Sequence, residues 1–418
     1  MPRVSVIMAA LNAAAFIDKA IASVLSQGCS DWELIVVDGG STDGTGEVIS
    51  RIPDPRIRCI RQSDPGLGAA RNQGTAQSSA QYLAFLDADD WWEPDCLRVL
   101  SRALDDHPRC AVAHGDWSFA DTDCVVHGRQ SSTFAYGEGL KSLVLFNPIA
   151  VHAALVRRSA LLAVGGFPEQ AVFHEDWGLW LRLAAAGHRF VHIPQVVAYY
   201  RWRPGSLSKD AHRAKASRLA TLQWLWAPGT LPAALHAARA RSYSTAYVDF
   251  CVSQFAIGDL PAALQELDTA LAYDGAAASA VDTYYRIAFA NDPAGLSLDE
   301  PAARVRIQAV LAHLSTLLSE AELSGCRHAA HHALGLACYR CQAHAAARRH
   351  MLKALRHKPS SLLARDFSAS LARILLPAKA IQVVRQVKGS VRPRHGMKPI
   401  QVEFEQRSMG SPSDRHNG

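Results

Sequence analysis

One stretch decides the fold class: Tyr82-Leu83-Ala84-Phe85-Leu86-Asp87-Ala88-Asp89-Asp90. Five apolar residues indicate a strand covered on both faces, which is typical of a parallel sheet, and carboxylates follow at once. The arrangement recurs in Leu34-Ile35-Val36-Val37-Asp38, whose strand also ends in an acid. Because the carboxyl ends of parallel strands meet along one edge, where such folds bind ligands, these acids predict a single site there.

Around these two segments, strand-like and helix-like patterns alternate. We expect further strands at 4–8 and 57–61, and helices at 14–27, 45–51, 67–76 and 94–107. This alternation predicts an α/β domain, a Rossmann-like, mostly parallel sheet flanked by helices, over residues 1–210. Alanine-rich helical patterns then predict an all-α domain at 211–388, and the polar, basic residues 389–418 predict a flexible tail.

Two stretches of the helical half, 247–274 and 331–359, resemble each other. Small residues seven apart with a large apolar one between them let two helices pack closely, a spacing that resembles tetratricopeptide repeats. The second stretch overlaps a cluster rich in Cys and His at 326–344. Cys338 and Cys341 have a spacing used by zinc sites, but without a partner pair they are better explained as buried thiols.

The charge of the chain is concentrated near its C-terminal end. The whole chain carries +6, whereas residues 339–398 alone hold fourteen Lys or Arg and one acid. That end is explained either by solvated helix faces or by attraction to an anionic membrane surface or a protein partner. Nucleic acid is not expected, because no binding motif accompanies the charge.

The ends and composition of the chain predict a cytoplasmic location, and the basic end would allow peripheral attachment to the inner face of the cell membrane. We find no uncharged window of eighteen residues that could span a bilayer. The N-terminus lacks a signal-peptide core and cleavage site, and the nine scattered cysteines are expected to stay reduced.

The acids at the strand ends divide into two kinds. Asp43 and Asp90 are interpreted as helix caps, which Asp commonly provides at strand–helix junctions. Asp87 and Asp89 are crowded at one strand end and would repel each other unless a cation or donors lay between them. Hard carboxylate oxygens suit Mg²⁺ or Mn²⁺, so these two predict a divalent metal site.

Seven motifs in order make the first half of the chain resemble a known family. They are Val4-Ser5-Val6-Ile7 with Asn12, Ser23-Val24-Leu25-Ser26-Gln27, Glu33-Leu34-Ile35-Val36-Val37-Asp38, Ser41-Thr42-Asp43-Gly44-Thr45, Ala70-Arg71-Asn72-Gln73-Gly74, Phe85-Leu86-Asp87-Ala88-Asp89-Asp90 and Glu175-Asp176-Trp177. Over about residues 3–207 the chain resembles the family 2 inverting glycosyltransferases of the GT-A fold.

The resemblance implies a site for a nucleotide-sugar donor. Asp38 and the main chain near Ala9 would hold the base, Asp87 would lie near the ribose, and Asp89, with Asp87, would ligate the metal. Four further residues are implied in the donor site: Asn12, Asp64, Arg71 and Ala88. For Arg71, a structural pairing with a loop carboxylate is the alternative. Gly39 replaces the family's usual second acid, and the first strand lacks its usual Pro, so UDP-, GDP- and dTDP-linked donors all stay open.

The resemblance also assigns the acceptor side. Asp176 matches the general base that deprotonates a hydroxyl of a saccharide or lipid-linked acceptor, with Glu175 beside it to orient the base or touch the acceptor. Both acids would in any case favour the start of a helix. Arg201 and Ser206 resemble a closing segment that approaches the diphosphate.

Three other functions have sequence signatures that differ from those of glycosyl transfer. A sugar nucleotidyltransferase should carry a glycine-rich loop with a basic residue after its first strand, and Ala9-Ala10-Leu11-Asn12-Ala13 offers neither. A dinucleotide-binding oxidoreductase should show GxGxxG there. A non-catalytic scaffold with a degenerate transferase domain is disfavoured by the presence of Asp87, Asp89 and Asp176.

Overall fold

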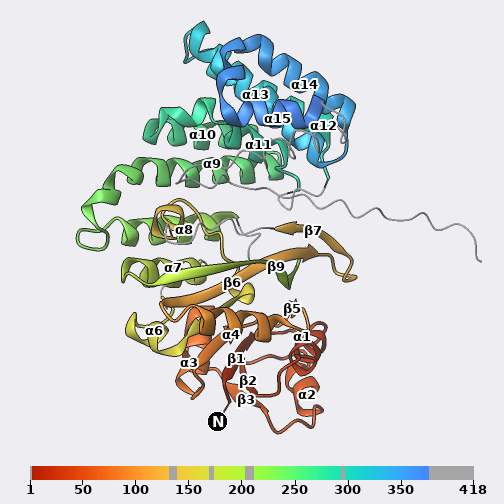
Figure 1. Cartoon of the computed structure of the whole chain (residues 1–418), viewed down its shortest axis with the longest axis vertical. Helices are drawn as coiled ribbons and strands as arrows, with labels where there is room; N and C mark the ends of the chain where they lie inside the picture. Colours follow the sequence, from red (N-terminus) through yellow and green to blue (C-terminus); the bar gives the residue numbers. More distant parts are fainter. Residues whose placement is uncertain (1, 131–138, 169–173, 203–210, 293–296, 376–418) are drawn as a thin grey trace, which may run out of the picture. The chain divides into compact units, whose positions relative to one another are not determined.

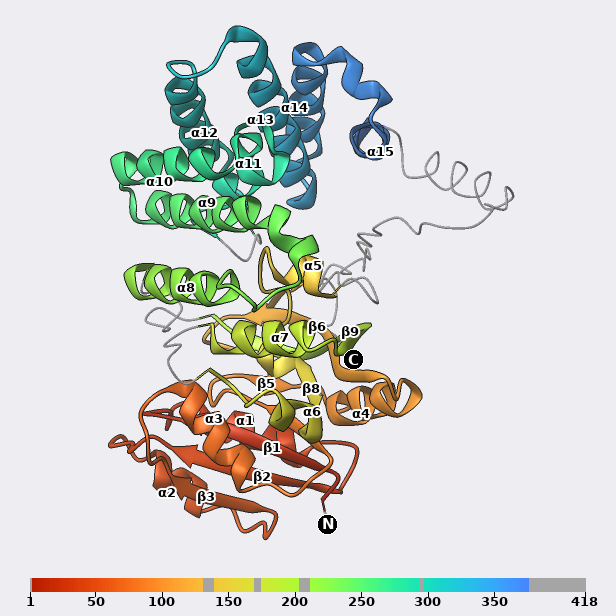
Figure 2. The same cartoon turned by 90° about the vertical axis from the view of Figure 1, so that its left-hand side faces the viewer.

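The structure is a computed structural model, and it describes residues 2–130, 139–168, 174–202, 211–292 and 297–375. Residues 1–375 form one compact unit. The predicted tail at 389–418 lies outside the described residues. The domain boundaries at 210 and 388 stay predictions. Figures 1 and 2 show strands only in the first half of the chain and helices alone beyond it.

The strands form a single mixed sheet in the order β3-β2-β1-β4-β8-β6-β9-β5, with β7 beside β6. Their bounds are β1 (Val4–Ala10), β2 (Trp32–Asp38), β3 (Ile57–Arg61), β4 (Tyr82–Phe85), β5 (Trp91–Trp92), β6 (Cys110–Ala120), β7 (Val126–Gln130), β8 (Ala154–Arg157) and β9 (Arg189–Arg201).

The predicted parallel arrangement is confirmed for β3, β2, β1 and β4. Beyond β4 the sheet is mixed rather than parallel. There β8 runs antiparallel to both β4 and β6, and β5 runs antiparallel to β9. The sequence missed this change because β5 has only two residues and β8 only four, too few to show a periodic pattern.

Helices flank the sheet and then continue alone. Their bounds are α1 (Ile17–Leu25), α2 (Thr45–Ser50), α3 (Leu67–Ala76), α4 (Cys96–Asp106), α5 (Gly139–Leu143), α6 (Arg158–Ala163), α7 (Glu175–Ala185), α8 (Ala211–Leu225), α9 (Arg239–Ile257), α10 (Leu260–Tyr273), α11 (Val281–Ala288), α12 (Glu300–Leu314), α13 (Glu320–Arg340), α14 (His344–His357) and α15 (Arg365–Leu375).

Both faces of the central strands are buried, which explains why those strands are almost wholly apolar. Along β1, Ile7 belongs to the core cluster that contains residues of α3 and α7. Its neighbours Val6 and Met8 belong to a second cluster that contains residues of α1 and α4. A Cβ on Gly74 of α3 would lie 2.5 Å from Ile7 Cγ2, so this glycine lets α3 lie close against β1 and carry Arg71 to the sheet edge.

The helical half contains the two expected hairpins, α9 with α10 and α13 with α14. In the second, a Cβ on Gly335 would lie 2.7 Å from Met351 Sδ, so a small residue there permits close helix packing. The resemblance to tetratricopeptide repeats stays a prediction. Among the helices that the structure describes, none is long and apolar enough to cross a membrane.

The first two helices of this half pack against the sheet domain. Buried side chains of α8 and α9 belong to the same apolar cluster as Trp177 and Trp180 of α7, namely Leu222, Leu225, Tyr243 and Ala246. Trp226, directly after α8, belongs to it too. Ser242 also donates to the carbonyl of Val144, in the segment after α5. The helix that begins with Glu175 and Asp176 is therefore packed between the sheet and the helical half.

Candidate active site

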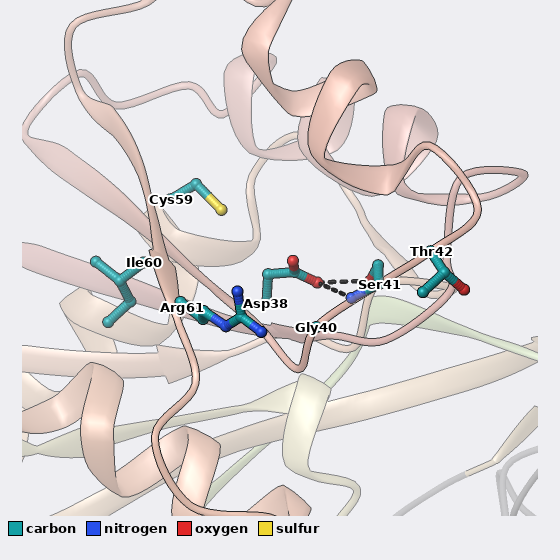
Figure 3. Close-up of a pocket in the computed structure, with 7 residues that line it drawn as sticks. All are labelled: Asp38, Gly40, Ser41, Thr42, Cys59, Ile60 and Arg61. Carbon is teal, nitrogen blue, oxygen red and sulfur yellow. Dashed lines mark hydrogen bonds between the residues drawn. The ribbon is translucent and has the colours of Figure 1, made fainter.

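A cavity of about 340 Å³ opens at the carboxyl ends of β2 and β3. Asp38, the last residue of β2, lines it opposite Arg61, its register partner at the end of β3, and Figure 3 shows the two side chains close together. Ser41 donates to Asp38 Oδ1 through both its backbone N–H (3.1 Å) and its hydroxyl (2.5 Å). The carboxylate is thus fixed at the cavity with its other oxygen still able to accept.

The turn after β1 is bonded to the turn after β2. Asn12 adopts a positive φ of 50°, and its amide oxygen accepts from Thr42 N–H at 2.9 Å. Asp43 accepts from Ala14 N–H and from Thr45 N–H, the first residue of α2, but the N-cap position of that helix is occupied by Gly44, so Asp43 bonds the helix start from the residue before the cap. Of the seven residues predicted for the donor site, Asp38 alone lines this cavity. Ala9 lies in β1, where it is paired with Val37 of β2, and Asp64 is exposed on the loop after β3.

A buried guanidinium joins the strand-end acids to α7. Arg71, from α3, lies 2.6 Å from Asp87 through Nη2 and also pairs with Glu175 through Nη1. Its side chain is 2% exposed, and that of Glu175 is 7% exposed. Burial raises the pKa of Glu175, more than the attraction of Arg71 lowers it. Arg71 therefore makes the predicted structural pairing, and does so with two of the predicted site residues.

Asp176 is half-buried at the start of α7 and has neutral partners. Its Oδ2 accepts from Asn147 Nδ2 at 2.9 Å, and its Oδ1 accepts from Trp177 N–H at 2.7 Å. Burial raises its pKa above the ordinary value. A partly exposed carboxylate whose pKa is raised and whose hydrogen-bond donors are neutral groups is suited to take up a proton.

Asp87, Asp90 and His152 form a group that could hold a metal ion, since one ligand atom from each lies within 4.8 Å of the others. His152 Nδ1 lies 3.1 Å from Asp90 Oδ2, and His152 Nε2 is buried with no hydrogen-bond partner among the described residues. Burial raises the pKa of Asp90. Carboxylate oxygens and imidazole nitrogens are ligands that suit a divalent cation.

The prediction that Asp90 caps a helix is wrong. Its side chain is 1% exposed and accepts from Arg201 N–H at 2.8 Å, while α4 starts only at Cys96, after Asp95. The physical reason is that Trp91 and Trp92, the two residues after Asp90, are buried in β5. The preceding acid therefore lies in the interior and not at a helix start.

The remaining predicted residues lie around this turn. Asp89 is partly exposed, and its carbonyl accepts from Arg201 Nε at 2.8 Å, while Ala88 between the acids is buried. Arg201 ends β9 with its side chain buried, and its Nη1 donates to the Thr122 carbonyl. Ser206 lies outside the described residues.

Sequence reasoning missed two side chains of the site, His152 and Asn147. Both come from the segment between α5 and β8, for which the sequence pattern predicts no strand or helix. The signal that could have found His152 is a lone imidazole flanked by apolar residues on both sides, in Ala150-Val151-His152-Ala153-Ala154.

Residues 5–165 match the glycosyl transferase family 2 domain. The chain is 31% identical over 213 residues to the UDP-Glc:alpha-D-GlcNAc-diphosphoundecaprenol beta-1,3-glucosyltransferase WfaP of Escherichia coli, covering 50% of this chain and 81% of that protein. It is 39% identical over 234 residues to an uncharacterized glycosyltransferase of Nostoc sp., covering 53% of this chain and 71% of that protein. The putative teichuronic acid biosynthesis glycosyltransferase TuaG of Bacillus subtilis is 28% identical, with 51% and 84% covered.

These matches define the class as glycosyltransferases, enzymes of polysaccharide and glycoconjugate synthesis. The chain belongs to glycosyltransferase family 2, as its motifs predicted, and its mixed sheet with flanking helices is the GT-A fold.

Two solved structures are similar in fold. The mannosyltransferase PcManGT from Pyrobaculum calidifontis, in complex with GDP-Man and Mn²⁺, has a TM-score of 0.48 at 20% identity, with 75% of this chain and 86% of that chain covered. S. aureus TarS 1–349, in complex with UDP-GlcNAc, has a TM-score of 0.47 at 15% identity, with 79% and 91% covered.

Proposed function

We propose that the protein is a metal-dependent, inverting transferase that moves a sugar from a nucleoside diphosphate to a hydroxyl of a saccharide or lipid-linked acceptor. One observation carries the proposal: Arg71 binds both Asp87, beyond the end of β4, and Glu175, the neighbour of Asp176. A single guanidinium thus spans the donor-side acids and the candidate base, so both lie within reach of one bound sugar.

Asp176 is our candidate general base. The acceptor hydroxyl loses its proton to this carboxylate while its oxygen forms a bond to the anomeric carbon, and the bond from that carbon to the phosphate oxygen breaks on the opposite face. The nucleoside diphosphate leaves with the bonding electrons, and the sugar is inverted. Glu175 is less suited to this role because its carboxylate is engaged by Arg71.

Asp38 is our candidate for base recognition, because a carboxylate accepts the ring N–H that uracil, thymine and guanine all offer. The 340 Å³ cavity falls within the usual size of ligand pockets, about 300–1,000 Å³. A UDP-linked donor and a diphospholipid-linked acceptor are our first choice, since the similar enzyme WfaP is named for both.

Asp87, Asp90 and His152 would hold the divalent ion, with Asp89 on the same turn as the further candidate ligand. A bound Mg²⁺ or Mn²⁺ would neutralise charge on the departing diphosphate. Arg71 Nη2 donates to Asp87 Oδ1 and so fixes the orientation of that carboxylate.

Nucleotide binding tests the donor side of the proposal. We expect UDP with Mn²⁺ to raise the melting temperature of the protein, and more than GDP or dTDP does. In Asp38→Asn the affinity should fall about 10- to 100-fold, because a hydrogen bond to a charged group contributes about 1.5–3 kcal/mol. Asp18→Asn, an exposed acid on α1, is the control. If no nucleotide stabilises the wild-type protein, the proposed donor site does not exist.

A metal titration separates the candidate ligands. We expect His152→Ala and Asp89→Ala each to weaken the Mn²⁺-dependent gain in nucleotide affinity at least tenfold. His127→Ala, whose imidazole pairs with Asp121 on a surface turn, should leave it unchanged. If only Asp89→Ala loses the Mn²⁺-dependent gain in nucleotide affinity, the ligands are limited to Asp87 and Asp89. If both variants keep that gain, the metal site is refuted.

A further inference from the structure

A side chain from the helical half contacts the residue next to the candidate base. Arg218, on α8, lies with its Cζ 5.6 Å from the centroid of the Trp177 ring. Trp177 follows Asp176 directly and is 1% exposed. Because the N–H of Trp177 donates to Asp176 Oδ1, any movement of this residue also moves the carboxylate.

Arg218 is held in place by a chain of charged side chains from two further helices. Its Nη1 donates to Asp249 Oδ2 on α9, and Arg286 Nη1 on α11 donates to Asp249 Oδ1. Burial alone would raise the pKa of Asp249, but the two guanidinium groups lower it, so the carboxylate stays ionised and keeps both partners. The position of Arg218 is therefore set by the helical half.

The remaining N–H groups of the Arg218 guanidinium make no hydrogen bond to the described residues. Its side chain is 12% exposed, and its Nε and Nη2 are buried with no hydrogen-bond partner among the described residues. A buried N–H group that makes no hydrogen bond costs free energy of folding. Packing of the guanidinium against the electron-rich ring of Trp177 compensates for part of that cost. The ring edge is fixed separately, by donation from Trp177 Nε1 to the Leu143 carbonyl at 2.8 Å.

We propose that Arg218, held by Asp249, is a positioning residue that clamps Trp177 and so orients the Asp176 carboxylate toward the acceptor. The inference rests on the proposed function of Asp176. It gives the helical half a role in the chemistry: α8 and α9 complete the support of the base, whatever else the helices bind.

The test compares two cations of the same helix. Lys215 lies one turn before Arg218, pairs with Glu266 on α10, and stands over the rings of Tyr247 and Phe250 on α9. We expect Arg218→Met to lower kcat about 10- to 100-fold, the size of loss that a small misplacement causes, with the donor KM and nucleotide affinity unchanged. Lys215→Met should keep kcat within about twofold, although it deletes a comparable ion pair.

Further variants separate positioning from loss of folding. Arg218→Lys, which keeps a cation over the ring, should recover part of kcat, and Asp249→Asn should lower kcat as Arg218→Met does. The melting curve of each variant shows whether it is folded, and nucleotide-induced stabilisation shows whether its donor site is intact. Normal kcat in folded Arg218→Met, or an equal loss in Lys215→Met, would overturn the inference. A wild-type protein without sugar transfer would instead refute the proposed function itself.

Discussion

Asp176→Asn is expected to lower kcat for sugar transfer by about 10²- to 10⁴-fold, the usual contribution of a general base, while nucleotide affinity and melting temperature stay close to the wild type. The amide cannot accept the proton of the hydroxyl, but it still fits the half-buried space and can accept from Trp177 N–H. The measurement is kcat with saturating donor and acceptor, alongside nucleotide binding.

The pH dependence of the same reaction gives a second readout. The base works only when ionised, and burial raises the pKa of Asp176, so kcat of the wild type should fall on acidification at a higher pH than an ordinary Asp would give. Asn147 donates to the ionised carboxylate and lowers that pKa, so Asn147→Ala should move the acid limb further up in pH.

The control for Asp176→Asn is Asp366→Asn, since Asp366 is likewise an acid in the first turn of its helix, α15, and is exposed. It should leave transfer unchanged, which separates proton uptake from the general preference of helix starts for acids. Near-normal transfer in Asp176→Asn would show that another group is the base, and Glu175→Gln would then be the variant to measure.

The part of the site made by strand ends could be predicted from the sequence because its signal is local. An apolar run followed directly by an acid marks Asp38 and Asp87 as residues of one sheet edge, and parallel pairing of β1 with β2 and β4 brings these ends together. Nothing beyond hydrophobic pattern and the order of segments is needed to place them.

The contacts between distant segments could not be predicted in this way. Arg71 and Glu175 are 104 residues apart, and Arg218 comes from a helix beyond the sheet domain. A short pattern around Arg71 does not contain its partners, which depend on how α3 and α7 meet. The prediction for Asp90 was wrong for the opposite reason. Its local sequence is typical of a helix cap, but the burial of Trp91 and Trp92 beside it places the carboxylate in the interior.

Arg71→Met is expected to destabilise the protein by about 3–5 kcal/mol, the usual cost of removing one partner from a buried ion pair. Methionine fills much of the space but leaves the carboxylates of Asp87 and Glu175 without their shared cation. Chemical denaturation measures the loss. Arg98→Met, which breaks an exposed pair with Asp95 on α4, should cost no more than about 1 kcal/mol.

The loss should depend on pH with a definite sign. Without Arg71 the folded-state pKa of Glu175, already raised by burial, rises further, so the ionised form is the costly one. The deficit of Arg71→Met is therefore largest above that pKa and shrinks as acidification neutralises the carboxyl group. For the same reason Arg71→Met combined with Glu175→Gln should be more stable than Arg71→Met alone. A deficit that grows on acidification, or a double variant that is no more stable, would mean that Arg71 stabilises the fold through packing on Phe167, whose ring centroid lies 5.4 Å from its Cζ, and not through the buried carboxylate.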